Sequence, residues 1–425
     1  LTVIANRSEF EVSTWLPNVS FPIPPSWAGN IPVSGNPGED RQLYFWMFPA
    51  TGDIGHDDVV IWLNGGPGCS SLSATLEENG PVMLDPITYE AKANPDTWTQ
   101  YANIIWIDQP AGVGFSLGTP KNQTMEEVAQ EFNGFLLQLY AKFAKLQGKR
   151  LWITGESFAG NPILHMDHWI YNNEEENTKA GILLQGVNVD DPLFAPNVVT
   201  KELPSVDYGL AYQKELNLTS DEVHELEQIG EQNGIRHFVR DHLTYPPKGP
   251  ISIPPNLNTT FSPYDHLKQM IMSHNPCFSP YYTVNKSPCG TLDALGANMT
   301  TQATFPLGYF HHPPVVAAIN AQPNISWVQC SQHPNFKIMK TANTNYPVPD
   351  VFGKVIEKSK KTIVQHGTHD YVVLFNGSAL AIQNMTWHGK QGFQHPPSKT
   401  LSVDGEKKGY YQTERNLTFV VIKGA

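Results

Sequence analysis

Charged side chains are scarce in this sequence, and the positive ones are the scarcer. Only 16% of the 425 residues are charged, with 28 Lys and Arg against 40 Asp and Glu, so the net charge is −12. No basic patch stands out, although a protein that binds nucleic acid or an anionic membrane surface carries one. We therefore expect neither nucleic acid nor a membrane as a partner.

Long apolar runs are missing as well. No stretch of about 18 apolar residues occurs, so we expect no membrane-spanning helix. The first residues, 1–4, do not form a signal peptide, and the sequence reads as a mature chain whose leader, if there was one, is gone. Hydrophobic residues make up 40%, and Gly (33) and Pro (35) are plentiful, which is typical of a large core with many loops.

Cysteine is rare, and its spacing fits no zinc site. Cys69, Cys277, Cys289 and Cys330 leave every pairing open, and we predict structural disulfides, no metal and no cofactor. In contrast, Asn-x-Ser/Thr sequons are dense, and we predict glycans on many of them. Both features favour the secretory route and a secreted or vacuolar/lysosomal protein. The sequon residues are Asn6, Asn18, Asn122, Asn217, Asn258, Asn285, Asn298, Asn324, Asn376, Asn384 and Asn416.

Short apolar runs alternate with segments of helical periodicity, which indicates a mostly parallel sheet with helices on its faces. The expected strands are 41–49, 59–63, 103–107, 151–153, 362–365 and 417–423, with helices over 124–146, near 219–243 and around 355–356. Residues 1–40 hold six prolines and are predicted to be irregular. We predict core parts at 1–189 and 312–425, separated by an insertion at 190–311 that caps the active site and is largely helix and loop.

Two loops after predicted strands carry the chemistry. Ser157 follows the run 151–153 and has Gly155 and Ala159 two residues to either side, a pattern of a strained nucleophile elbow. The string 64–71, Asn-Gly-Gly-Pro-Gly-Cys-Ser-Ser, follows strand 59–63. It lacks the Gly-Lys-Ser/Thr of a phosphate loop, so an oxyanion loop is the better interpretation.

Four segments together resemble the serine carboxypeptidases, peptidase family S10. They are the string 64–71, Asp108-Gln109-Pro110, the elbow 155–160 and Gly367-Thr368-His369-Asp370. The fungal carboxypeptidase S1-like branch is the most similar, helped by Asn384-Met385-Thr386-Trp387. The likeness runs from about residue 40 to the end, and it implies an α/β-hydrolase fold with helices on both faces of the central sheet.

The resemblance implies a hydrolase that releases C-terminal amino acids from peptides and proteins, favoured at acidic pH. Ser157 would be the nucleophile and Asp370 the acid that orients a histidine, with the backbone N–H groups of Gly66 and Phe158 as the oxyanion hole. Asn64, Gly65, Glu78 and Glu156 would bind the free carboxylate of the substrate. Because like charges repel, at least one of the two glutamates must then carry a proton.

The family pattern also implies the disulfides Cys69–Cys330 and Cys277–Cys289. This sequence departs from the family pattern at several points. Ala159 occupies a position where the family has Gly, Phe158 one where it has Tyr, and Asn161-Pro162 follows the elbow in place of the usual family residues. The family histidine lies in Gly-His-Met-x-Pro after the last strand, and this sequence stops at Gly424-Ala425, so we expect that histidine just after Ala425. His366, His369, His388 and His395 are the alternatives within the sequence.

Two other functions stay open at this point. An acyltransferase or lyase on the same scaffold would keep the same catalytic groups. A catalytically impaired peptide binder would explain why the expected histidine does not occur in the sequence.

Overall fold

The computed structural model describes residues 8–85, 88, 90–120, 124–258, 260–284, 295, 308–333, 335–336 and 348–425. The chain divides into two compact units. Unit 1 consists of Leu1–Asn188 and Thr291–Ala342, and unit 2 of Val189–Gly290 and Asn343–Ala425. The predicted division into core and insertion stays a prediction.

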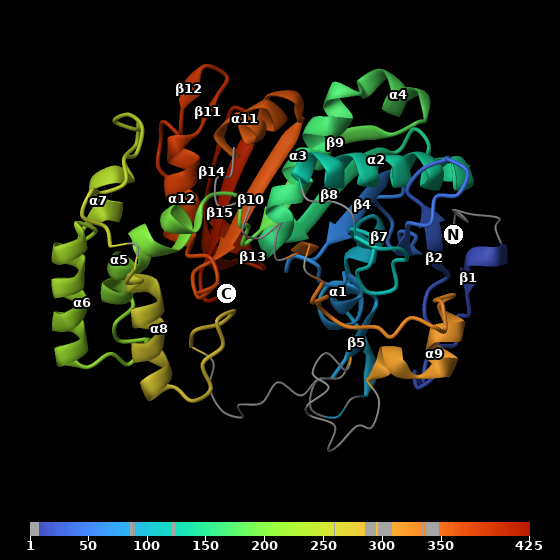
Figure 1. Ribbon diagram of the computed structural model, residues 1–425, viewed down its shortest axis with the longest axis horizontal. Coiled ribbons are helices and arrows are strands. Elements are labelled where there is room, and N and C mark those ends of the chain that lie inside the picture. Colours follow the sequence, from blue (N-terminus) through green and yellow to red (C-terminus); the bar gives the residue numbers. More distant parts are fainter. Residues whose placement is uncertain are drawn as a thin grey trace. The chain divides into compact units, whose positions relative to one another are not determined.

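Unit 1 is built on a run of strands in the order β1-β2-β3-β7-β4-β8-β9, in which β9 ends in the first residues of unit 2 (Figure 1). β7, β4 and β8 pair in parallel, whereas β1, β2, β3 and β7 pair antiparallel. The strands are β1 Glu11–Val12, β2 Ser26–Pro32, β3 Gln42–Phe48, β4 Asp58–Leu63, β7 Asn103–Asp108, β8 Arg150–Glu156 and β9 Leu183–Asp190, with a hairpin of β5 Val82–Leu84 and β6 Ala91–Ala93.

The helices of unit 1 cover this sheet. The long helices α2 and α3 lie side by side (Figure 1). α2 begins at a capping box in which the Thr124 hydroxyl accepts from Glu127 N at 3.2 Å. The helices are α1 Leu72–Glu77, α2 Met125–Lys142, α3 Gly160–Asn172, α4 Glu174–Lys179 and α9 Pro313–Ala318, with 3-10 turns η1 Ser8–Phe10, η2 Trp98–Gln100, η3 Ala144–Leu146, η4 Ser157–Ala159 and η7 Tyr309–His311.

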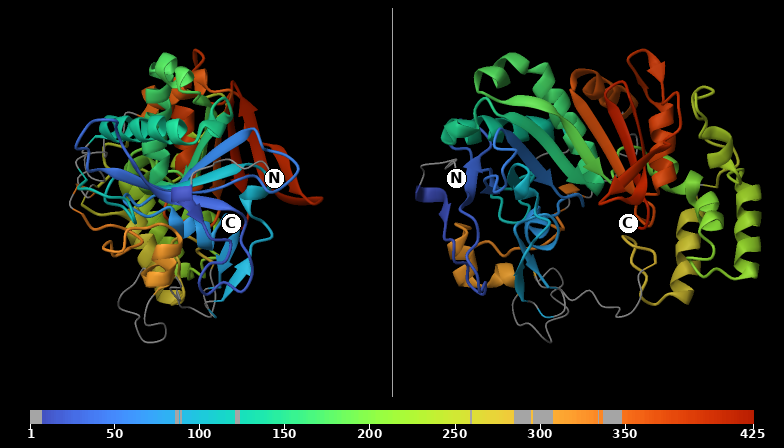
Figure 2. Two further views of the ribbon diagram at one scale, coloured as in Figure 1. Left: turned by 90° about the vertical axis from the view of Figure 1, so that its right-hand side faces the viewer. Right: turned by 180° about the vertical axis from the view of Figure 1, so that it is seen from behind.

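Large aromatic side chains fill one core of unit 1, among them Tyr44, Trp46, Trp106 and Trp327, each at most 1% exposed. Trp46 and Trp106 face each other across β3 and β7. Burying such rings supplies most of the hydrophobic stabilisation of a sheet. The segment 308–333, orange in Figure 2, lies beside the blue N-terminal segment, where the Tyr309 hydroxyl donates to Pro17 O at 3.1 Å.

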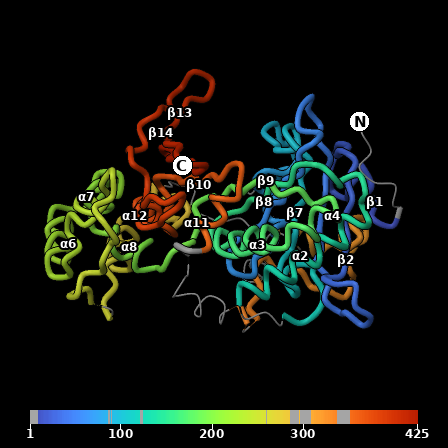
Figure 3. Tube along the Cα trace, turned by 90° about the horizontal axis from the view of Figure 1, so that it is seen from above, coloured from blue at the N-terminus to red at the C-terminus, as the bar shows by residue number. Residues whose placement is uncertain are grey.

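Unit 2 has a second run of strands, in the order β10-β15-β14-β13. β10 and β15 are parallel, and the others are antiparallel. Figure 3 shows the β13–β14 hairpin extending away from helices α6, α7 and α8. The elements are η5 Val198–Glu202 (a π-helix), α5 Leu203–Ala211, α6 Ser220–Asn233, α7 Phe238–His242, α8 Pro263–His274, α11 Val348–Lys358, β10 Lys361–Gly367, α12 Phe375–Asn384, β11 Thr386–Trp387, β12 Lys390–Gln391, β13 Lys399–Val403, β14 Glu406–Glu414 and β15 Leu417–Ile422.

The predicted strands and helices match β3, β4, β7, β8, β10, β15, α2, α6 with α7, and α11. The prediction for residues 1–40 was wrong, because β2 pairs with β3 there. Prolines 24, 25 and 32 bracket that strand rather than break it, and Gly29 at φ 150° leaves room for Phe10, whose Cδ1 would lie 2.8 Å from an added Cβ. Helix α8 was also missed, since the helix predicted within the insertion was the one near 219–243.

Within the part of the chain that the structure describes, no helix has the length and apolarity needed to cross a bilayer.

Candidate active site

Ser157 stands on a sharp turn between strand β8 and helix α3. Its φ is +55°, a left-handed conformation that costs a non-glycine residue energy and is typical of a strained functional turn. Small residues make the turn possible, because a Cβ at Gly155 would lie 2.2 Å from Leu63 O on neighbouring β4. Ser157 is half-buried, so the turn presents a hydroxyl that is not enclosed by the core.

The glycine-rich loop lies directly against this turn. A Cβ added at Gly65 would lie 2.7 Å from Phe158 N and 2.8 Å from Ser157 Cβ, closer than side chains pack. The structure therefore brings together Ser157 and the backbone of the two predicted oxyanion residues, Phe158 beside it and Gly66 next to Gly65. Gly66 has φ +114°, which also favours glycine.

This contact makes a prediction for Gly65, whose φ is not in the left-handed region, so that space alone decides the outcome. We expect Gly65→Ala to lower kcat/KM by about 10²- to 10³-fold, because the added methyl pushes an oxyanion donor off its position. The matched control is Gly35→Ala, whose Cβ would meet only Gln138 Nε2 at an ordinary 3.5 Å. Equal activity of the two variants would contradict the close approach.

Two devices hold the glycine-rich loop in place. The disulfide Cys69–Cys330 joins it to a later segment, and Ser70 N donates to Gln329 O at 2.7 Å. Asp108, at the end of β7, accepts from the Ser70 hydroxyl at 2.6 Å and from Ser71 N at 2.9 Å. Burial raises the pKa of Asp108 to about 6, while these hydrogen bonds lower it. The sequence motif included Asp108, but sequence analysis assigned it no role. A carboxylate at the end of a buried strand could have indicated that it holds a neighbouring loop.

The predicted carboxylate-binding residues meet at one amide. Asn64 Nδ2 donates to Glu78 Oε1 at 3.2 Å and to Glu156 Oε1 at 2.9 Å. Trp62 Nε1 donates to Asn64 Oδ1 at 2.9 Å, which fixes the orientation of the amide. Asn64 is buried, Glu156 half-buried and Glu78 exposed, so the cluster opens to solvent at Glu78. Two carboxyl groups on one amide repel each other when both are ionised.

A small cavity borders this cluster. Asn64, Gly65, Gln109, Phe158 and Pro162 belong to its lining, so it touches both the elbow and the glycine-rich loop.

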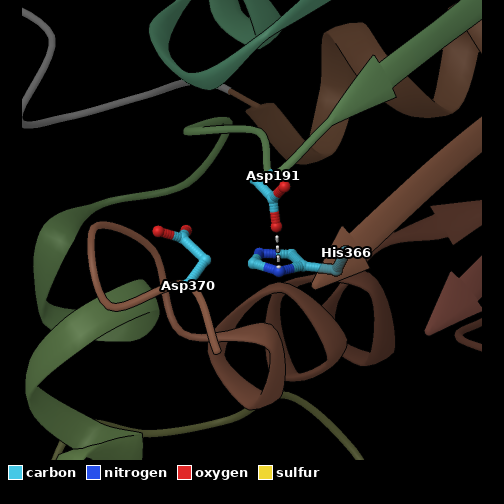
Figure 4. Close-up of side chains that lie close together, drawn as sticks. All are labelled: Asp191, His366 and Asp370. Atoms are coloured by element: carbon cyan, nitrogen blue, oxygen red, sulfur yellow. Dashed lines mark ion pairs between the residues drawn. The ribbon is translucent and has the colours of Figure 1, made fainter. Parts of the chain in front are cut away.

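Asp370 lies in the loop after β10, in unit 2. Its carboxylate accepts from Val372 N and Val373 N, each at 2.9 Å. Burial and the neighbouring Asp191 raise the pKa of Asp370, His366 and the two backbone donors oppose them, and the pKa is raised overall to about 7. Figure 4 shows the Asp191 carboxylate pointing at the His366 ring, with the Asp370 side chain to one side of both. Sequence analysis gave Asp191 no role.

The chain's last residue lies beside the same loop. Ala425 O accepts from His369 N at 2.7 Å, and Ile422 O accepts from Thr368 N at 3.0 Å. Position 425, after which the histidine is expected, is thus next to the residues that precede Asp370.

The alternative histidines lie in different surroundings. His366 is fully buried, whereas His369 is partly buried, with its ring against Tyr212 and Tyr282. His388 is exposed, and His395 is exposed and paired with Glu414 at 3.0 Å. Among the described residues, Asp191, His366 and Asp370 are the group with metal-ligand atoms close enough to hold an ion.

The predicted disulfides and sequons are partly within the described residues. Cys69–Cys330 is present. Cys289 lies outside the described residues, so the pairing with Cys277 stays a prediction. Asn6, Asn122, Asn285 and Asn298 also lie outside them. Of the other sequon residues, Asn376 and Asn384 are half-buried, and the exposed ones are Asn18, Asn217, Asn258, Asn324 and Asn416.

Comparison with known proteins decides the family, since a family model described as "Serine carboxypeptidase" matches residues 17–425. This chain belongs to the serine carboxypeptidase family. Two relatives are 34% identical. The "Probable serine carboxypeptidase" of Arthroderma benhamiae aligns over 96% of this chain and 80% of its own length, and "Serine-type carboxypeptidase F" of Aspergillus niger over 92% and 74%.

A solved structure shows the fold. Kex1, described as a prohormone-processing carboxypeptidase from Saccharomyces cerevisiae, matches with a TM-score of 0.71 at 22% identity, over 98% of this chain and 91% of that one. The serine carboxypeptidase described here therefore has the predicted α/β-hydrolase fold, with a large mixed sheet and helices. The family match and the two relatives at 34% identity make it a serine-type carboxypeptidase, a family that acts on peptides.

Proposed function

We propose that this serine carboxypeptidase removes amino acids from free peptide C-termini through an acyl-enzyme on Ser157. The observation that carries the proposal is the contact of Gly65 with Ser157 and Phe158, which supports a nucleophile beside backbone donors. The hydroxyl attacks the last peptide carbonyl, and the N–H groups of Gly66 and Phe158 stabilise the oxyanion. The bond to the last residue breaks, and water then releases the shortened peptide.

In this proposal Asp370 orients and charges the histidine that takes the Ser157 proton and passes it to the leaving amine. Two backbone N–H groups hold the Asp370 carboxylate in one orientation. The hydrogen bond between His369 N and Ala425 O supports a histidine soon after Ala425, because it keeps the end of the chain beside this loop.

The cluster of Asn64, Glu78 and Glu156 is proposed to hold the substrate's terminal carboxylate, with Gly65 beside it. Asn64 is placed to donate, but a carboxylate beside two glutamates is repelled unless at least one of them is protonated. Protonation turns that glutamate into a donor, so binding is favoured in acid.

This makes a prediction for the pH dependence of substrate binding. We expect KM of a peptide with a free C-terminus to rise about tenfold or more from pH 4 to pH 8, as the shared proton is lost. Glu156→Gln, which carries an amide donor at every pH, should flatten this dependence, and Glu90→Gln, an exposed site, should not. A flat wild-type KM would contradict this role.

The same peptide with an amidated C-terminus should be a poor substrate, and its KM should not follow this pH trend. Release of its last residue at the same rate as from the free peptide would contradict recognition of the C-terminal carboxylate.

The secretory route is proposed on two observations. Cys69 and Cys330 form a disulfide, and five sequon asparagines are exposed. Digestion of the protein from its native source with peptide N-glycosidase is expected to lower its mass by several glycans. An unchanged mass would contradict glycosylation.

A further inference from the structure

His366 is a buried histidine that lies close to two acidic side chains. It is the penultimate residue of β10 and is 0% exposed. Its Nδ1 donates to Asp191 Oδ1 at 2.7 Å, and one ligand atom each of Asp191, His366 and Asp370 lie within 4.8 Å of one another (Figure 4). Its Nε2 is buried and has no hydrogen-bond partner among the described residues.

The site is built to hold this ring. Asp191 Oδ1 also accepts from Gly367 N at 2.8 Å, and Asp191 N donates to Gln365 O at 3.0 Å, so Asp191 is anchored on β10 at both sides of His366. Since a carboxylate can only accept, Nδ1 carries a proton. A second proton on Nε2 would make the ring an imidazolium beside Asp370.

The charges of the cluster favour that form. Burial lowers the pKa of His366, but Asp191 and then Asp370 outweigh it, and the pKa is raised overall. Of the neighbouring groups, burial raises the pKa of Tyr208 and Tyr264 and lowers that of His369, so burial favours the neutral form of each. The cluster then holds an imidazolium paired with Asp191 and lying beside Asp370, whose own pKa is raised to about 7.

We infer that His366 is a positioning residue that favours the ionised form of Asp370, acting as an imidazolium anchored on Asp191. The inference rests on the proposed role of Asp370 as the acid of the catalytic triad. Both Asp370 oxygens accept backbone N–H groups, and Asp191 Oδ1 has two donors. These carboxylate oxygens therefore already have hydrogen-bond donors and a charged partner, so the arrangement needs no metal ion to explain it.

The test is the pH profile of kcat/KM for the full-length enzyme. In His366→Asn the amide can still donate to Asp191 but never carries a charge. Losing a cation beside Asp370 makes every nearby acid harder to ionise, so we expect the acid limb of the profile to move up by about one pH unit, a loss of about tenfold on that limb. At the plateau the loss should be small. The control, His395→Asn, removes an exposed histidine of the same unit and should leave the limb unmoved.

A second measurement needs neither activity nor a variant that folds. We expect nitrogen-15 NMR of wild-type imidazole groups to show His366 with both ring nitrogens protonated at pH 6. A neutral ring at that pH overturns the inference, as does an unmoved acid limb in an active His366→Asn enzyme. A ring whose signals change on adding Zn²⁺ or EDTA also overturns it, in favour of a metal site. If the wild type lacks peptidase activity while the ring is charged, the proposed function fails and the charge assignment stands.

Discussion

Replacing Ser157 with alanine is expected to lower kcat/KM for peptide hydrolysis by about 10⁶-fold. The loss is that large because the acyl-enzyme cannot form, and the oxyanion donors alone give only a small residual rate. Binding of peptide should be retained, since the carboxylate cluster of Asn64, Glu78 and Glu156 is untouched. Both quantities can be measured, with release of free amino acid for the rate and equilibrium dialysis of a peptide for binding.

The control for Ser157 is Ser402→Ala, an exposed serine of β13. A fluorophosphonate reagent should label the wild type and Ser402→Ala but not Ser157→Ala. Hydrolysis that survives in Ser157→Ala, or a label on another serine, would show that the nucleophile lies elsewhere. A wild type that binds peptide but takes no label would instead be the impaired binder.

Asp370→Asn is expected to lower kcat/KM by about 10⁴-fold, because an amide cannot stabilise the charged histidine of the triad. It should not destabilise the fold. Burial raises the pKa of Asp370 from 3.8 to about 7, so the folded state binds this proton more tightly than the unfolded one. Ionising Asp370 as the pH rises between these two pKa values therefore lowers the free energy of unfolding. The uncharged amide of Asp370→Asn does not ionise and avoids this loss.

The measurement pairs a rate with a melting curve at pH 7, for Asp370→Asn and for the exposed control Asp404→Asn. We expect Asp370→Asn to be inactive with a Tm at least equal to that of the wild type. An active Asp370→Asn would remove Asp370 from the triad. A Tm well below that of Asp404→Asn would mean that its carboxylate is needed for the fold.

The elements that were predicted well from the sequence are those whose burial produces a simple run of apolar residues. Strands β4, β7 and β8 are near-continuous apolar runs because neighbours or helices cover them, and the elbow of Ser157 follows directly from one of them. Strand β2 was not predicted, because its glycine and the prolines in and before it are typical of a loop. Pairing with β3 outweighs that local preference.

The polar network around the site was harder to foresee. Asp191 and His366 are 175 residues apart in sequence, and no local pattern shows that Asp191 Oδ1 accepts from His366 Nδ1 and Gly367 N. The partners of Asp108 are likewise set by the path of the glycine-rich loop. Such contacts follow from the fold, so motif spacing predicts candidate catalytic groups but leaves out the residues that hydrogen-bond to them.

The link from Cys69 to Cys330 spans 261 positions of the chain. During synthesis the glycine-rich loop therefore leaves the ribosome long before Cys330 and the Gln329 carbonyl, which accepts from Ser70 N. A growing chain thus contains Ser157 well before this disulfide can hold the glycine-rich loop beside it.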